Sequence, residues 1–281
     1  MRLGVWGVNL DSKALEYFID ACLDLGLNDF DHADIYGHYT TEAQFGEVFK
    51  RRPDLISKCQ LTTKCGIKLV CNKRPETLVK SYDSSPEYIL QCVENSLKEL
   101  HVECLDLLLI HRPDYLMDMS AIADTFSFLK SKGMVKEIGV SNFKPHQFEV
   151  LNALHPLVTN QIEASVLYRE AFENGTLDQC IKNKIVPTAW SPLGGGLLFK
   201  PTEDPIVKAI QKIGNQIAED HKASLDQILL AWLMKHPSNI IPVIGSSNID
   251  RIKLAKEAAS MTLTHQEWYQ LWEAAIGEEV A

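Results

Sequence analysis

Four polar side chains, each placed at or just after the end of an apolar run, are the candidates for chemistry in this sequence. Asp31 and Tyr36 lie in "DFDHADIYG", Lys64 lies in "TTKCG", and His111 ends "LDLLLIH". A phenol has a pKa of about 10, so it donates a proton poorly at neutral pH unless a nearby cation lowers that pKa. Lys64 is a candidate for this cation, Asp31 can keep the lysine charged, and His111 can orient a substrate oxygen. The set predicts a general acid that protonates a carbonyl oxygen.

Each of these residues has a simpler interpretation when it is taken alone. Aspartate is common in turns, a lysine can extend from a strand end to solvent, and a histidine can fill the rim of a fold. The functional interpretation is favoured because all four residues follow predicted strands and would lie on the same face of one sheet.

The elements that must position these residues are eight apolar segments that alternate with helical patterns. Several segments are apolar at both odd and even positions, which is typical of parallel strands buried on both faces. Eight strands with intervening helices predict an α/β fold, a (β/α)8 TIM barrel with its active site at the C-terminal face of the strands. The segments are RLGVWG, LNDFDHA, CQLTTKCG, LDLLLIH, KEIGVSN, VTNQIEAS, IVPTAWS and IIPVIGS.

We expect residues 1–281 to form a single barrel domain, because no linker or low-complexity stretch divides them. A doubly wound open sheet is the alternative, and the absence of a Gly-x-Gly-x-x-Gly turn after the first segment disfavours it. The longest connections, roughly 67–85, 111–120 and 192–204, follow strands, as functional loops do in a barrel. Loop 67–85 is a candidate wall or lid of the site, with Cys71, Lys73, Arg74 and Tyr82.

Composition limits the classes of function. The net charge of −9 argues against a broad nucleic-acid surface, and seven cysteines without a CxxC pair indicate reduced thiols. No signal peptide and no apolar run long enough to cross a bilayer is present. We therefore expect a cytoplasmic protein with a small-molecule partner, no nucleic acid and no membrane. The oligomeric state stays open, and a monomer is the preferred expectation.

Seven motifs run in order through almost the whole chain and together identify a family resemblance. The chain resembles the aldo-keto reductases, and the branch it is most similar to is that of bacterial oxidoreductases related to the potassium-channel β subunits. The resemblance implies that Tyr36 is the proton donor, Lys64 and Asp31 tune it, and His111 orients the carbonyl. Hydride would come from a nicotinamide cofactor, NADPH in preference to NADH. The motifs are DHADIYG, TTKCG, LDLLLIHRPD, GVSNF, NQIEAS, AWSPLGGG and IPVIGSS.

The resemblance also implies the residues that bind the cofactor. Amide and hydroxyl side chains complement the nicotinamide carboxamide, an indole can stack on its ring, and glycines let the backbone approach phosphates. Trp6 and Arg112 are expected to line the substrate mouth. The implied cofactor residues are Ser141, Asn142 and Gln161 for the carboxamide, Trp190 for the ring, Ser191, Leu193, Gly194, Gly195 and Gly196 for the pyrophosphate, and Ser246, Ser247 and Arg251 for the adenosine 2′-phosphate.

Some positions depart from the family pattern. Gly245 stands where many members have a phosphate-binding lysine, and Leu254 and Ala255 replace polar residues near the adenine. These departures leave open the margin of NADPH over NADH. The chain starts directly at its first predicted strand, so a leading segment is either lacking or truncated. The tail after Trp272 is short, which predicts an open pocket and broad substrate tolerance.

Two other functions are compatible with parts of the pattern. A cofactor-binding regulatory or sensor subunit with little turnover would share the cofactor site. A metal-dependent hydrolase would use Asp31, His32, Asp34, His38 and His111, but their spacing matches no recognised ligand pattern and would leave Tyr36 and Lys64 unexplained. We therefore expect no metal.

Overall fold

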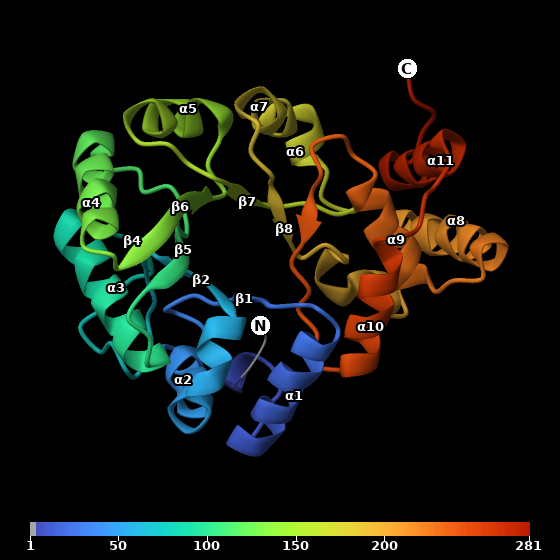
Figure 1. The fold of residues 1–281 in the computed structure, drawn as a ribbon. Helices are drawn as coiled ribbons and strands as arrows, with labels where there is room; N and C mark the ends of the chain where they lie inside the picture. Colours follow the sequence, from blue (N-terminus) through green and yellow to red (C-terminus); the bar gives the residue numbers. More distant parts are fainter. Residues whose placement is uncertain (1–3) are drawn as a thin grey trace. The chain divides into compact units, whose positions relative to one another are not determined.

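Parallel strands that alternate with helices make up the protein in this computed structural model, which describes residues 4–281 (Figure 1). Two compact units are present, one ending at Asn160 and the other comprising Gln161–Ala281. Each unit is described by itself.

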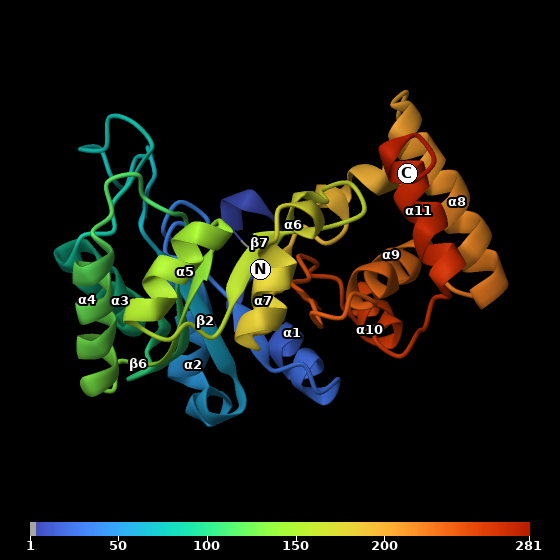
Figure 2. The same ribbon diagram turned by 90° about the horizontal axis from the view of Figure 1, so that it is seen from above.

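The first unit contains four parallel strands, paired in the order β1-β2-β5-β6. The sequence predicted all four. Each contains buried apolar residues, and helices lie along the outer side of the strands (Figures 1 and 2). The strands are β1 (Asp29–Asp31), β2 (Gln60–Cys65), β5 (Leu105–Ile110) and β6 (Val135–Ser141), and the helices are α1 (Ser12–Asp24), α2 (Thr41–Arg51), η2 (Pro53–Lys58), α3 (Pro86–Leu100), α4 (Met119–Ser131) and α5 (Pro145–Leu154).

The predicted first strand, RLGVWG, is wrong where the structure describes it. Gly4–Trp6 form a short 3-10 helix, η1, and residues 2 and 3 lie outside the described part. The side chain of Val5 is 71% exposed and that of Trp6 is 40% exposed. An apolar run forms a buried strand only where other elements pack over its side chains. The side chains of Val5 and Trp6 lack such packing.

Loop 67–85 is more ordered than the sequence indicated. β3 (Ile67–Lys68) and β4 (Ser81–Tyr82) pair as an antiparallel hairpin. At its tip the Lys73 ammonium donates to the carbonyl of Tyr39 at 2.8 Å. The segment is therefore fastened to the turn that follows Tyr36 instead of extending freely into solvent.

The second unit contains the parallel strands β7, β8 and β9, paired in that order, and β7 begins at the boundary residue Asn160. The described chain thus has seven parallel strands, against eight expected. Capping boxes are present at Ser224, before α9, and at Thr264, before α11. The elements are β7 (Asn160–Glu163), β8 (Thr188–Trp190), β9 (Ile241–Pro242), α6 (Glu170–Glu173), α7 (Thr176–Asn183), η3 (Gly194–Phe199), α8 (Pro205–His221), α9 (Leu225–Met234), α10 (Ile249–Ala258) and α11 (His265–Ile276).

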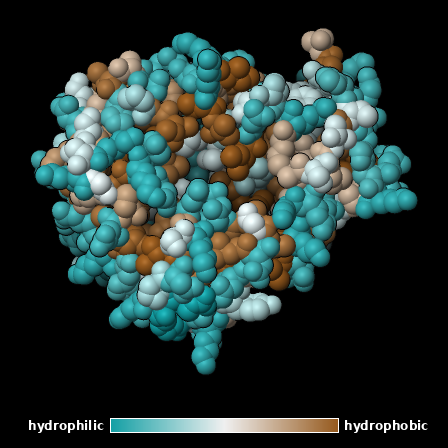
Figure 3. All heavy atoms as spheres, viewed as in Figure 1, coloured by the Kyte–Doolittle hydropathy of each residue, from teal (hydrophilic) through white to brown (hydrophobic). Residues whose placement is uncertain are grey.

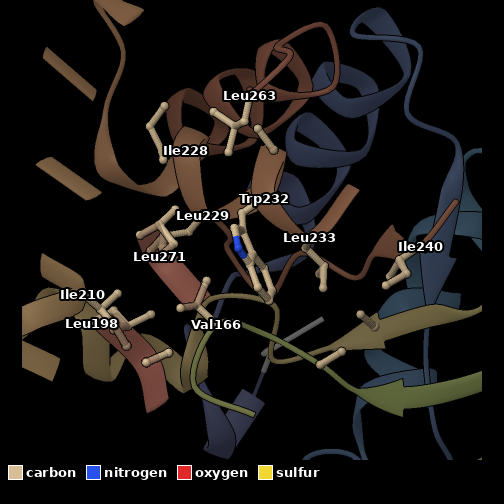
Figure 4. Packing of buried hydrophobic residues seen from close by; sticks show 14 of the residues in the cluster. Val166, Leu198, Ile210, Ile228, Leu229, Trp232, Leu233, Ile240, Leu263 and Leu271 are labelled. Carbon is tan, nitrogen blue, oxygen red and sulfur yellow. The ribbon is translucent and has the colours of Figure 1, made fainter. Parts of the chain in front are cut away.

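An aromatic centre organises the second unit. The fully buried Trp232 of α9 lies among aliphatic side chains from several elements (Figure 4). Its indole stacks on Trp268 of α11 with ring centroids 4.9 Å apart. The Nε1 of each indole donates to the backbone carbonyl of the other residue at 3.0 Å. Polar and apolar contacts therefore fix α11 against α9.

Hydrophilic side chains cover much of the face shown in Figure 3, as the amphipathic helix patterns predict.

Among residues 4–281, no helix has the length and apolar character that a membrane crossing requires. All seven cysteines are free thiols, which agrees with the predicted reduced state.

We expect Gly46→Ala to lower the free energy of unfolding by about 3 kcal/mol or more, because the added Cβ would overpack a rigid contact. That Cβ would lie 1.9 Å from the backbone oxygen of Glu99 in α3, where α2 and α3 meet. Chemical denaturation measures the change.

Gly214→Ala in α8 is the matched control. Its added Cβ would meet a methyl group of Leu225, which can move, and alanine favours the helix. We expect a change within about 1 kcal/mol. Equal losses in the two variants would contradict the close-approach explanation.

Candidate active site

The buried ammonium group of Lys64 is the centre of the candidate site. Lys64 is 1% exposed, and its Nζ donates to Asp31 Oδ2 at 2.6 Å, to the carbonyl of His32 at 2.7 Å and to Tyr36 Oη at 3.2 Å. An ammonium group has three N–H donors, so every donor is used. Burial alone lowers the pKa of Lys64, but Asp31 and Tyr36 raise that pKa above its usual value. Lys64 is therefore charged at neutral pH.

Strand pairing brings Asp31 and Lys64 together. β1 and β2 are parallel, with Asp31 beside Thr62, and Lys64 lies two residues further on the same face of β2. The amide of His32 donates to the carbonyl of Thr62 at 2.8 Å, and that of Asp34 donates to the carbonyl of Lys64 at 3.0 Å. These bonds carry the pairing past the end of β1 and place the carbonyl of His32 where Lys64 can reach it.

Tyr36 presents a phenol oxygen to this charge. Its amide donates to the carbonyl of Ala33 at 3.0 Å, which closes a turn directly after β1. The Lys64 ammonium lies 5.0 Å from the centre of its ring. Because Oη accepts from Lys64, its own proton can be donated elsewhere.

The predicted net lowering of the phenol pKa is wrong for this structure. Burial is the largest influence and raises the pKa of Tyr36, and the opposing effect of Lys64 only partly offsets it. The sequence revealed the cation but not the loss of solvent around the phenol. A raised pKa keeps Tyr36 protonated at neutral pH, which is the form that a proton donor needs.

His111 lies beside Tyr36, with ring centroids 6.0 Å apart and ring planes at 76°. Burial lowers the pKa of its imidazole well below the usual value, and the cations Lys64 and Arg112 lower it further. The imidazole is therefore neutral, with one N–H to donate. Its amide donates to the carbonyl of Cys65 at 2.8 Å, so β2 holds the start of this loop.

Ser141 and Asn142 end β6 and lie next to His111. The Asn142 side-chain amide donates to Ser141 Oγ at 2.7 Å and to the carbonyl of His111 at 3.3 Å. Asn142 has a φ of 60°, a left-handed conformation that asparagine tolerates better than most residues. The structure therefore groups six of the predicted residues at the C-terminal ends of β1, β2, β5 and β6.

The other predicted cofactor residues lie in the second unit. Gln161 is 3% exposed in β7, and Trp190 ends β8, followed by Ser191 and the 3-10 helix η3, which Leu193 precedes. Gly195 and Gly196 have φ values of 63° and 86°, and a Cβ at either would meet nothing within 4 Å. These glycines leave backbone open to an approaching group.

Ser246, Ser247 and Arg251 surround the start of α10. The capping residue of this helix is Asn248, whose Oδ1 accepts from the amides of Asp250 at 2.9 Å and Arg251 at 3.2 Å. Ser246 Oγ in turn accepts from the amide of Asn248 at 3.1 Å. The Arg251 side chain is exposed and forms no ion pair within residues 4–281, so it is available to an anion.

The family assignment follows from the sequence as a whole. The model of the Aldo/keto reductase family matches residues 1–276. The chain belongs to the aldo/keto reductase family. It is accordingly an NAD(P)H-dependent oxidoreductase of the carbonyl-reducing type.

Relatives and solved structures agree with this assignment. The chain is 40% identical over 284 residues to the 6-dehydroglucose reductase of Agrobacterium fabrum, and the match covers 99% of this chain and 94% of that protein. It is also 40% identical over 284 residues to the oxidoreductase YdhF of Escherichia coli, with the same coverage.

Two solved structures share the fold. The glycerol dehydrogenase of Gluconobacter oxydans is 24% identical with a TM-score of 0.84, covering 100% of this chain and 94% of that one. An aldo/keto reductase of Klebsiella pneumoniae, solved with NADP and acetate, is 21% identical with a TM-score of 0.76, covering 96% and 89%. These matches confirm the predicted TIM-barrel class.

Sequence reasoning missed three contributors to the sites of this aldo/keto reductase. The carbonyl of His32 binds Lys64, and Asn248 caps α10. His38 accepts a hydrogen bond from Trp6 Nε1 at 3.3 Å, and the Trp6 ring lies edge-on to Tyr36, with centroids 6.1 Å apart. Asparagine before an acidic first turn was a usable capping signal for Asn248. A backbone carbonyl such as that of His32 has no signal in the residue type.

The residues considered for a metal do not form a metal site. The structure shows no group of three or more His, Cys, Asp or Glu side chains in residues 4–281 that is arranged to hold an ion. His32 is fully buried against Phe45, and both its ring nitrogens lack a hydrogen-bond partner within the described chain. Burial lowers the pKa of His32 to about 3, so it is neutral.

Asp34 predicts a pH dependence of stability. Burial and, to a smaller extent, the neighbouring charge of Glu42 raise its pKa from 3.8 to about 8. The unfolded chain loses this proton near its ordinary pKa and the folded chain only near pH 8, so stability falls as pH rises between the two values.

Replacing Asp34 by Asn removes this titration. We expect Asp34→Asn to gain stability relative to the wild type by about 3 to 4 kcal/mol between about pH 5 and about pH 8. Melting curves across this range measure the difference. A difference that does not change with pH would mean that the folded protein ionises Asp34 normally.

Proposed function

We propose that this enzyme reduces aldehydes or ketones to alcohols with NADPH and that Tyr36 donates the proton. The observation that carries the proposal is the Lys64 ammonium group, bonded at once to Asp31 and to the phenol oxygen of Tyr36. A buried charge held by a carboxylate and aimed at a phenol is a costly arrangement that stability alone does not require.

Each residue of the candidate site would have its own role in the reaction. NADPH, when bound, would supply the hydride for the carbonyl carbon. His111, as a neutral donor, hydrogen-bonds the carbonyl oxygen and orients it. Tyr36 transfers its proton to that oxygen as negative charge develops there. The resulting phenolate is stabilised by Lys64, which Asp31 keeps charged, until solvent returns a proton.

We propose the cofactor residues from the family pattern together with their local chemistry. Ser141, Asn142 and Gln161 have the donors and acceptors that a carboxamide needs. Trp190 offers a ring for stacking, and the turn Ser191–Gly196, with its open glycines, suits a pyrophosphate. Ser246, Ser247 and the exposed Arg251 suit a 2′-phosphate, which favours NADPH over NADH in spite of Gly245.

The substrate class rests on the mouth of the site and on the relatives. Trp6 lies against Tyr36, and Arg112 influences the pKa of both Tyr36 and His111, so we propose both as substrate contacts. Since a relative at 40% identity is named 6-dehydroglucose reductase, sugar aldehydes belong in the substrate panel with simple aldehydes, diketones and quinones. We further infer a single-domain enzyme that acts in the cytoplasm.

Tyr36→Phe tests the proton donor. We expect it to lower kcat by about 10²- to 10⁴-fold, because the general acid is lost, while NADPH binding is retained. The measurement is NADPH consumption with the substrate panel, together with titration of each protein with NADPH.

Tyr39→Phe is the matched control. Tyr39 is a nearby buried phenol whose hydroxyl bonds to the backbone of Ile67 and Leu69 and to the side chain of Tyr88. We expect it to keep its turnover within a few-fold of wild type. Turnover that survives in Tyr36→Phe would refute the assignment of the donor. Cofactor binding without turnover in the wild type would instead support the sensor alternative.

Arg251→Gln tests the preference for NADPH. Losing a charged partner of the 2′-phosphate should weaken NADPH binding by about tenfold or more and leave NADH binding nearly unchanged. Fluorescence titration with both cofactors measures this. Lys253→Gln, on the same helix, is the control, and equal effects of the two variants on NADPH would argue against a specific contact.

A further inference from the structure

Glu42 is a buried carboxyl group that the reaction described above does not use. It lies in the first turn of α2 and is 2% exposed. Thr63 Oγ1 in β2 and Ser96 Oγ in α3 donate hydrogen bonds to its two oxygens, the latter at 2.9 Å. A single side chain therefore joins one strand and two helices.

The contact with Thr63 acts on the strand that carries Lys64. Successive side chains of a strand point to opposite faces of the sheet, so Thr63 and Lys64 project in opposite directions. Glu42 therefore holds β2 from the helix side, at the residue directly before Lys64. A shift of Thr63 along or away from α2 would displace the backbone from which Lys64 extends.

The start of α2 is also hydrogen-bonded to the segment that carries Tyr36. The carbonyl of Tyr36 accepts hydrogen bonds from the amides of Thr40 at 3.1 Å and Thr41 at 3.3 Å. Thr41 is the first residue of α2, and Glu42 is the second. The segment that carries Tyr36 is thus bonded to the start of the same helix whose first turn bears Glu42.

α3 completes the arrangement. One turn after Glu42, Gly46 approaches the backbone of α3 so closely that a Cβ would lie 1.9 Å from the carbonyl oxygen of Glu99. With Ser96 bonded to Glu42, this contact leaves α2 little freedom to slide on α3. These two contacts hold the N-terminal part of α2 in a fixed position on α3.

We propose that Glu42 is a positioning residue for the reaction. It ties the Tyr36 segment to the Lys64 strand and thereby maintains the 3.2 Å contact between Tyr36 Oη and Lys64 Nζ. The inference rests on the proposed function, because it assigns a role within the same site.

The protonation of Glu42 guides the choice of variants. Burial raises its pKa to about 7, its two hydroxyl donors oppose this, and the charged groups that influence it include Asp34, Glu99 and Lys64. Glutamine has the size of the protonated acid and can bond to both hydroxyls, whereas alanine removes both bonds. Thr63→Val removes only the bond to β2 at nearly constant volume.

The experiment compares Glu42→Ala, Glu42→Gln and Thr63→Val with the wild type. Glu47→Gln, an exposed position on the same helix, is the control. We expect Glu42→Ala and Thr63→Val to lower kcat about tenfold, with KM and NADPH affinity little changed. The alkaline limb of the kcat–pH profile, where Tyr36 loses its proton, should move up by about one pH unit as Lys64 leaves Tyr36. Glu42→Gln and Glu47→Gln should remain near wild type.

Crystal structures of the wild type and Thr63→Val provide a readout that does not require turnover. We expect the separation of Nζ and Oη to increase in the variant. A lower melting temperature with an unchanged pH profile and an unchanged separation would overturn the proposal, and Thr63→Val decides the question if Glu42→Ala does not fold. Lack of turnover in the wild type would refute the proposed function, and the measured separation would still test the link.

Discussion

A buried positive charge is the constraint on which the first unit depends. The ammonium group of Lys64 has almost no contact with solvent, so the protein must supply three acceptors within hydrogen-bond distance. One comes from a side chain at the end of β1, one from the backbone beyond that strand, and one from the turn that begins α2. The charge thus determines how β1, β2 and the following turn are arranged, and the same arrangement creates the candidate proton donor.

Two carboxyl groups close to the candidate site affect the stability of the first unit. The buried carboxyl groups of Asp34 and Glu42 have raised pKa values, which means that the folded state resists their ionisation. Such groups weaken the fold at higher pH, and a purely structural protein would gain by replacing them. Both groups lie beside the strand of Lys64 and the turn of Tyr36. Their position indicates that they help to maintain the geometry of the site, although they lower the stability of the fold.

The second unit carries predicted cofactor residues in the segments that follow β8 and β9. Its stability comes from the aromatic centre around Trp232 and from aliphatic packing. The segments that follow β8 and β9 contribute open glycines, hydroxyl groups and an exposed arginine. A rigid core of this kind allows the loops at strand ends to keep conformations that suit a ligand better than they suit packing.

The sequence by itself determined the family, the identity of the four catalytic candidates and seven of the strands, because apolar runs and ordered motifs are local signals. Tertiary structure decided the rest. Solvent exclusion reversed the net shift of the Tyr36 pKa, Gly4–Trp6 formed an exposed 3-10 helix instead of a strand, and pairing turned Ile67–Tyr82 into a hairpin with a connecting loop. The carbonyl of His32 became a partner of Lys64 only when β1 and β2 paired. Desolvation and backbone contacts depend on neighbours that are distant in sequence, and residue types do not record which neighbours those will be.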